Sequence, residues 1–180
     1  MKRNATTGLI TIICGFYLLQ LFVPSLQIDL GLFRGPVDGQ GVAAGEWYRI
    51  LTVALIHGSV MHLGFNMYAL WVLGNPLEAL FGKARFLAIF FFSLVTGSLT
   101  SLYLNPVYQL SVGASGALFG LFGAFALVAK RIGADVKSIL VIIGINFAMA
   151  FLLPGIDWHA HLGGLIGGLI ATKVILRIKK

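Results

Sequence analysis

One serine in this chain is placed where water should be scarce. Ser115 lies in the segment Gly113-Ala114-Ser115-Gly116, inside a run from Phe86 to Ala129 that has no Asp, Glu, Lys, Arg or His. A serine hydroxyl is a poor nucleophile until a neighbouring base takes its proton, and histidine has the pKa for that task near neutral pH. Acyl transfer through Ser115 therefore needs a histidine beside it. Taken alone, Ser115 could simply cap a helix.

Two histidines, His159 and His161, open the last apolar run of the chain. Helical periodicity leaves both open as the base, because positions 159, 163 and 167 share one glycine face, as do 161, 164 and 168. His161 lies further into the run, closer to a submerged serine, which favours it. Asp157 could orient a histidine one turn later, but as the last polar residue before the run it is expected to be an N-cap.

The other two histidines precede or open an earlier apolar run. His62 and Asn66 are four residues apart, so both lie on one face of a predicted helix. Their side chains could donate to a developing oxyanion, together with the free backbone N–H groups around Ser115 at a helix start. His57 is expected to position the preceding loop.

The segments that carry these residues are predicted to be membrane helices. Only 11% of the 180 residues are charged, against about 25% in an average soluble domain. The run of Phe86 to Ala129 is too long for one crossing and divides at Asn105-Pro106, which gives two spans of about 20 residues. Adding the other charge-poor runs predicts an all-α membrane protein with six crossings and one domain over residues 1–180. Those other runs are 4–28, 50–77, 138–156 and 158–172.

The basic residues predict the orientation of these crossings. With both termini in the cytoplasm, the inner side holds eleven of the thirteen, and the outer connections hold only Arg34 and Arg49. Every histidine then lies in the outer half of the membrane, level with Ser115. The eleven are Lys2, Arg3, Lys83, Arg85, Lys130, Arg131, Lys137, Lys173, Arg177, Lys179 and Lys180.

The helix that begins at Ser115 is expected to start below the outer surface. About 15 residues separate Ser115 from Lys130, or about 22 Å of helix, against a hydrocarbon thickness of about 30 Å. Small-residue faces should let this helix approach the last one closely. Glycines form these faces, at 116, 120 and 123 on one helix and at 163, 164, 167 and 168 on the other.

Several function classes fit the composition poorly. The net charge of +7 comes from basic residues at the ends of apolar runs rather than from a polar patch, so no nucleic-acid partner is expected. The stretch after Met1 is long for a secretory signal and has no convincing cleavage site. Cys14 is the only cysteine, which excludes an internal disulfide and a cysteine metal cluster. There is no HExxH motif, and we expect neither a metal nor a cofactor.

Three motifs together resemble those of the rhomboid intramembrane serine proteases. They are His62-Leu-Gly-Phe-Asn66, Gly113-Ala114-Ser115-Gly116, and Ala160-His161-Leu-Gly-Gly164 followed by Gly168. The segment Glu46-Trp47-Tyr48-Arg49 is similar to the tryptophan-arginine segment of the family's first loop. The family often has Trp-Arg where this chain has Tyr48-Arg49, and many members have glycine at the position of Ile156. The resemblance covers all six helices of the compact bacterial form.

The resemblance implies a catalytic dyad of Ser115 and His161 without an acidic third member. It also implies an oxyanion hole made by His62, Asn66 and the backbone N–H of Ser115. Phe119 falls where the family commonly places an aromatic ring on the histidine. Glu78 and Gly82 resemble a structural element at the inner end of the helix that carries His62.

The expected function is therefore that of an intramembrane serine endopeptidase in the bacterial cytoplasmic membrane. Its partners would be the lipid bilayer and single-span membrane proteins, which would be cut near the outer end of their transmembrane segment. The family also implies that substrates enter from lipid between the second and fifth helices. The alternative is a rhomboid-like protein that binds transmembrane helices without cutting them. A transporter fits less well, because no polar path continues toward the cytoplasmic side.

Overall fold

The computed structural model describes residues 4–152 and 155–178, and in these residues the chain is helical apart from connecting segments and isolated bridges. The all-α prediction is confirmed. Lys2, Arg3, Lys179 and Lys180, on which the orientation partly rests, lie outside the described residues. The long helices are α1 (Ala5–Phe22), α4 (Val60–Phe81), α5 (Lys83–Leu104), α6 (Ser115–Val128), α7 (Val136–Leu152) and α8 (Trp158–Ile178). Short helical segments are α2 (Leu26–Leu30), η1 (Val42–Ala44), α3 (Arg49–Thr52), η2 (Val53–Leu55) and η3 (Ala129–Ile132).

Three of the described helices, α1, α5 and α8, are long and apolar enough to cross a membrane. A fourth span is present if the segment 49–55 and α4 are taken together, although they meet at a bend of 99°. The run of 50–77, predicted as one crossing, is therefore broken. The break comes at 56–59, where Ile56 is extended and the Ser59 hydroxyl caps α4 by accepting from the His62 N–H at 3.1 Å.

The division of the central run at Asn105-Pro106 is confirmed, and so is the start of the second helix at Ser115. Helix α5 ends at Leu104, and α6 begins only at Ser115, so the connection between them is not helical. Ser111 in this connection forms an isolated antiparallel bridge with Leu32. Helix α6 therefore has 14 residues and begins inside the protein, since Ala114 and Gly116 are both buried.

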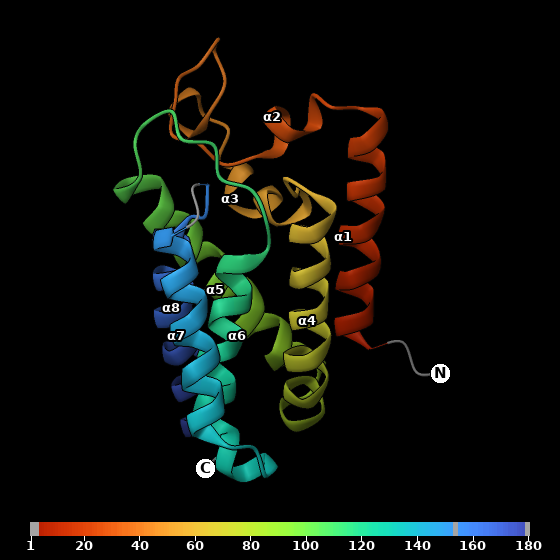
Figure 1. The fold of residues 1–180 in the computed structure, drawn as a ribbon, viewed down its shortest axis with the longest axis vertical. Coiled ribbons are helices and arrows are strands. Elements are labelled where there is room, and N and C mark those ends of the chain that lie inside the picture. The colour runs from red at the N-terminus through yellow and green to blue at the C-terminus, as the bar shows by residue number, and fades with distance from the viewer. Residues whose placement is uncertain (1–3, 153–154, 179–180) are drawn as a thin grey trace.

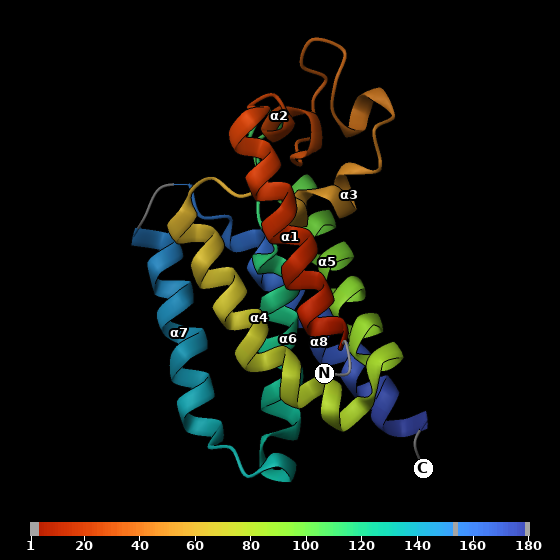
Figure 2. The ribbon, with the colours of Figure 1, turned by 90° about the vertical axis from the view of Figure 1, so that its right-hand side faces the viewer.

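Helix α6 is at the centre of the bundle and contacts α4, α5, α7 and α8. Helix α5 runs along α8, and α1 packs on α4. Helix α7 contacts α6 and α8 and stands at the edge of the bundle (Figures 1 and 2). The segment between α1 and α4 covers the end of the bundle at which α6 begins.

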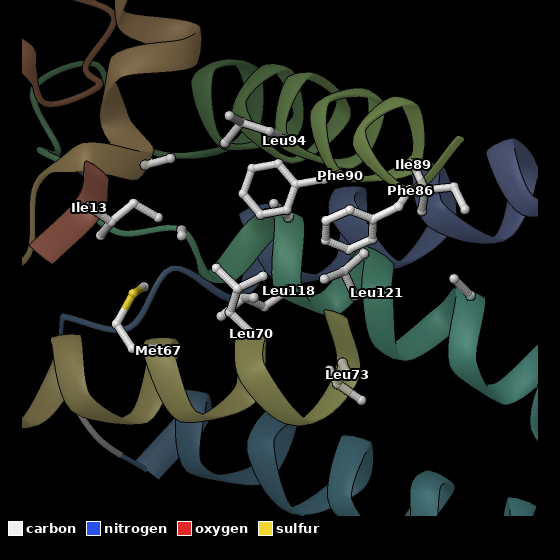
Figure 3. Close-up of a cluster of buried hydrophobic side chains, with 14 of the residues drawn as sticks. Ile13, Met67, Leu70, Leu73, Phe86, Ile89, Phe90, Leu94, Leu118 and Leu121 are labelled. Atoms are coloured by element: carbon white, nitrogen blue, oxygen red, sulfur yellow. The ribbon is translucent and has the colours of Figure 1, made fainter. Parts of the chain in front are cut away.

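The apolar core lies between α1, α4, α5 and α6 (Figure 3). Leu70 from α4 and Phe90 from α5 point toward Leu118 and Leu121 of α6, and Ile13 of α1 closes the cluster. All five side chains are at most 3% exposed. Because α6 is surrounded on several sides, its first residue, Ser115, is fixed relative to the neighbouring helices.

Glycines bring three helix backbones into contact beside the start of α6. A Cβ on Gly164 of α8 would lie 1.8 Å from the carbonyl oxygen of Gly116. A Cβ on Gly97 of α5 would lie 2.8 Å from the carbonyl oxygen of Ala160. Only glycine allows these approaches, so the predicted close packing of α6 and α8 is present and α5 takes part in it.

The two glycine faces of α8 point to different helices. Cβ atoms on Gly164 and Gly168 would collide with backbone atoms of α6. Cβ atoms on Gly163 and Gly167 would instead collide with Thr100 and Thr96 of α5, at 2.1 and 2.0 Å from their hydroxyl oxygens. The side of α8 on which a residue lies therefore determines which helix it meets.

A buried or partly buried charged side chain stabilises each end of the bundle through hydrogen bonds to backbone groups. Glu78 of α4 accepts hydrogen bonds from the backbone N–H groups of Ala5 and Thr6, so it caps the start of α1. At the other end, the fully buried Arg49 donates to the carbonyl oxygens of Ile28 and Gly31. These contacts fix α1 on α4 and fold the first loop over the bundle.

Candidate active site

Ser115 and His161 are in contact across the interface of α6 and α8. The Nε2 atom of His161 lies 3.0 Å from the Oγ atom of Ser115. Ser115 is the first residue of α6, and His161 lies in the first turn of α8 and is 6% exposed. The distance is that of a hydrogen bond between a hydroxyl and an imidazole, the arrangement needed for a base to take the serine proton.

The sharp turn into α6 requires glycine just before the serine. Gly113 has a φ of +113°, in the region that side chains other than glycine rarely adopt. A Cβ on Gly113 would also lie 2.7 Å from the Cε1 atom of His62. Gly113 therefore has both the conformation and the lack of a side chain that let α4 approach Ser115.

The imidazole of His161 is held by aromatic rings rather than by a carboxylate. The ring of Phe119, one turn after Ser115, stacks on it with centroids 4.1 Å apart and planes 10° from parallel. Phe147 of α7 meets both rings edge-on. Among the described residues, the Nδ1 atom of His161 has no hydrogen-bond partner. The sequence had pointed to Phe119 through the family but gave no sign of Phe147.

His159 lies on the other side of α8. Its Nδ1 atom is hydrogen-bonded to the Oδ1 atom of Asn105, the C-cap residue of α5. This follows from the two glycine faces, because residues in line with Gly163 face α5 and residues in line with Gly164 face α6. Of the two histidines left open by periodicity, His161 is the one that the structure brings to Ser115.

His62 and Asn66 lie on the α4 side of the same site. The His62 ring faces Gly113, two residues before Ser115, on the side where a Cβ of Gly113 would lie. Asn66, 6% exposed, donates one N–H to the His62 carbonyl oxygen at 2.8 Å, and its buried Oδ1 atom has no hydrogen-bond partner among residues 4–152 and 155–178. An amide nitrogen has two N–H groups, so this bond leaves a second donor.

His57 is fully buried beside His62, with ring centroids 5.0 Å apart. Its backbone N–H and carbonyl oxygen both pair with the side chain of Gln20 in α1, at 3.2 and 2.9 Å. His57 thus ties the end of the first loop to α1. This agrees with the positional role predicted for it.

A small cavity lies beside Ser115. Its volume of about 20 Å³ is enough for one water molecule. Ser98, Ser101, Ser111 and Asp157 supply polar groups to its wall. None of the three serines could be predicted as a site residue from the sequence, because isolated serines in an apolar run carry no motif.

Asp157 caps α8, as expected from its position. Its Oδ1 atom accepts a hydrogen bond from the Ala160 N–H at 3.0 Å. In the described part of the chain, no group of three or more His, Cys, Asp and Glu residues is arranged to hold a metal ion.

Comparison with known proteins gives a consistent set of relatives. The Rhomboid domain family matches residues 44–178, a stretch that contains Ser115, His161, His62 and Asn66. The rhomboid protease GluP of Bacillus subtilis (strain 168) is 38% identical over 89% of this chain and 32% of its own length. The putative rhomboid protease YdcA of the same organism is 35% identical over 90% of this chain and 85% of its own. RHOMBOID-like protein 5 of Arabidopsis thaliana is 35% identical over 79% of this chain and 48% of its own. The chain thus spans about a third of GluP and about half of the plant relative.

Proposed function

The chain belongs to the rhomboid family, and on that basis we propose that it is an intramembrane serine endopeptidase with Ser115 as nucleophile and His161 as general base. The observation that carries this proposal is the 3.0 Å contact between Ser115 Oγ and His161 Nε2 at the buried start of α6. Ser115 and His161 are 46 residues apart in the sequence. Their side chains lie at the hydrogen-bonding distance that acyl transfer by a serine and a histidine requires.

The reaction follows from the positions of these atoms. His161 Nε2 takes the Ser115 proton as Oγ attacks the carbonyl carbon of the substrate peptide bond. The negative charge that forms on the carbonyl oxygen is stabilised by hydrogen-bond donors, for which we propose the Ser115 N–H and the side chains of His62 and Asn66. His161 then gives its proton to the leaving amine. Water attacks the acyl-enzyme, again with His161 as base, and frees the carboxyl product and Ser115.

The first turn of α6 supplies the backbone donors for this step. Its N–H groups have no partner within the helix, and the positive end of the helix dipole favours negative charge at the same place. Ser115 is the first residue of α6, so the oxyanion would form where these donors point.

The substrates we propose are single-span membrane proteins. A transmembrane helix satisfies its own backbone hydrogen bonds, so a substrate must unwind locally before Ser115 can reach a peptide bond. Segments with small or helix-breaking residues should be preferred. On the outer face of α4, the exposed side chains of Met61, Phe65 and Tyr68 border a shallow apolar groove. That surface suits an approaching transmembrane segment.

We further propose that residues 1–180 form one domain with six membrane crossings, in the cytoplasmic membrane of a bacterium. Both described chain ends lie toward the same end of the bundle (Figure 1), which supports placing both termini in the cytoplasm. The α4–α5 corner with Lys83 and the η3 turn with Lys130 lie at that end as well. In this orientation the end of α6 that carries Ser115 faces the outer side of the membrane.

The test is cleavage of a labelled transmembrane substrate by the protein reconstituted in liposomes. We expect wild type to cut it and both Ser115→Ala and His161→Ala to lose cleavage. Equal cleavage by Ser115→Ala would overturn the proposal. If wild type binds the substrate helix but does not cut it under any condition, the alternative of a non-cleaving helix-binding protein is supported instead.

A further inference from the structure

Asp157 does more than cap α8, because its carboxylate joins three separate segments around the site. Its Oδ1 atom accepts from the Ala160 N–H at the start of α8. Its Oδ2 atom accepts from the Ser101 hydroxyl of α5 at 2.5 Å and from the Ser111 hydroxyl at 2.6 Å. Bonds of this length are typical of hydroxyls that donate to an ionised carboxylate.

The three segments are those that set the positions of the proposed catalytic groups. Ala160 directly precedes His161, and Ser111 lies four residues before Ser115. Ser101 is on α5, whose backbone touches both α6 and α8 at Gly97. Asp157 also lines the cavity beside Ser115. The carboxylate is therefore the point at which the chain carrying the serine and the helix carrying the histidine are joined by hydrogen bonds.

The hydrogen bonds around Asp157 have a fixed direction. Asn105 donates from Nδ2 to Ser101 Oγ, so the single proton of Ser101 is free to go to Asp157. His159 in turn is bonded to Asn105 Oδ1. Burial raises the pKa of the Asp157 carboxyl, but the hydrogen bonds from Ser101, Ser111 and the Ala160 N–H outweigh burial and leave the pKa below its usual value. The carboxylate form fits this network, because every neighbour donates to it.

The orientation of the His161 ring depends on packing and on the position of α8. Its Nδ1 atom has no hydrogen-bond partner in the described residues, so no carboxylate orients the ring directly. The direction of the ring depends on the Phe119 stack and on where the first turn of α8 lies. A shift of α8 by a fraction of an ångström changes the distance between Ser115 Oγ and His161 Nε2.

We propose that Asp157 is a positioning residue for the reaction, which holds His161 against Ser115 by tying the start of α8 to Ser101 and Ser111. This inference rests on the proposed function and extends it to a group that touches neither the substrate nor the reacting atoms. It differs from simple capping, because capping uses only Oδ1 and the bridge uses Oδ2.

Asp157→Asn separates the two roles. Asparagine caps helices as well as aspartate does, so its Oδ1 atom still accepts from the Ala160 N–H. Its other terminal atom is a donor, and it would face Ser101 Oγ, which already accepts from Asn105. The two bonds that Ser101 and Ser111 donate to Oδ2 are therefore lost, because an amide nitrogen cannot accept them, while the cap is kept. Asp135→Asn is the matched control, since Asp135 caps the start of α7 by accepting from the Ser138 N–H at 3.0 Å and lies away from the site.

The experiment measures the rate at which a fluorophosphonate labels Ser115, together with kcat and KM for a transmembrane substrate. For Asp157→Asn we expect labelling and kcat to fall about 10- to 100-fold with KM within about twofold of wild type. Asp135→Asn should match wild type in all three. Wild-type labelling and kcat in Asp157→Asn would overturn the inference and leave the proposed function intact.

If Asp157→Asn fails to fold, the variant Ser111→Ala alone tests the same inference. Ser111→Ala removes one donor and keeps the carboxylate and the cap. It should slow labelling, and adding it to Asp157→Asn should slow labelling no further, because both changes break the same bridge. Unchanged labelling in Ser111→Ala, or effects that multiply in the double variant, would contradict the proposal. If wild-type Ser115 neither reacts nor cuts any substrate, the proposed function itself fails.

Discussion

The carbonyl oxygen of Gly116 lies against the Cα of Gly164, so closely that a Cβ on Gly164 would be 1.8 Å from it. This contact joins α6 to α8 one residue after Ser115 and three residues after His161. The distance between the two proposed catalytic groups is therefore set by a backbone contact that admits no side chain.

Gly164→Ala should push α6 and α8 apart. Overpacking of this kind costs about 1–3 kcal/mol, so the melting temperature in detergent should fall. The cleavage rate should fall by more than the loss of folded protein explains, because the gap opens beside Ser115 and His161. Gly144→Ala in α7 is the control, since a Cβ there would meet nothing within 4 Å. Equal melting temperatures for the two variants would contradict the packing argument.

Phe119→Ala should lower kcat by releasing the imidazole of His161. A stacked aromatic pair contributes about 0.5–1.5 kcal/mol, which corresponds to a decrease of about 2- to 10-fold if the ring is then free to turn away. Phe119→Tyr keeps the stack and should retain activity. Kinetics with a transmembrane substrate would measure both. Phe92→Ala, on the exposed side of α5, should have no effect on kcat.

Even a conservative substitution of the buried Arg49 should destabilise the protein. Arg49→Lys loses the guanidinium fork that serves the carbonyl oxygens of Ile28 and Gly31 and the Glu46 carboxylate. The three donors of an ammonium group sit on one nitrogen and cannot match the separate Nε and Nη1 positions of the guanidinium, and a buried acceptor left unpaired costs about 1–3 kcal/mol. The melting temperature should fall in Arg49→Lys. Arg34→Lys in the same loop should leave it unchanged, and a fall of the same size there would argue against this account.

The contribution of Glu46 to stability should depend on pH. Its pKa is lowered by hydrogen bonds from the Gly41 N–H and from Arg49. Since the folded-state pKa lies below the unfolded value of about 4.3, the stabilisation is present above that value and is lost as the pH falls through the folded-state pKa. The melting temperature of wild type should exceed that of Glu46→Gln at pH 7, and the difference should shrink in acid. A difference that stays constant down to pH 3 would contradict this.

The sequence predicted the helical class, the division at Asn105-Pro106 and the short helix opened by Ser115. The predicted start at Ser115 and the predicted length of about 15 residues agree with the 14 residues of α6, but the break before α4 was missed. A hydropathy average is taken over a window of many residues. The three residues His57-Gly58-Ser59 lower that average too little to reveal a break in the apolar run. The break is instead caused by the Ser59 cap and the extended Ile56, which are local geometry.

Candidate site residues that depend on spacing were easier to predict than those that depend on tertiary contacts. Depth and the family motif both favoured His161, but periodicity could not separate it from His159, because α8 presents one glycine face to α6 and another to α5. The capping role of Asp157 was visible from its position before α8. Its bonds to Ser101 and Ser111 were not, because they join segments that are 56 and 46 residues away in sequence. The catalytic roles of Ser115, His161, His62 and Asn66 stay predictions.

The most direct test of the central claim is the site and rate of fluorophosphonate labelling, read by mass spectrometry of the detergent-solubilised protein. Wild type should be labelled at Ser115, His161→Ala should not be labelled, and His159→Ala should still be labelled at Ser115. Labelling of Ser115 that persists in His161→Ala and disappears in His159→Ala would contradict the assignment of the dyad.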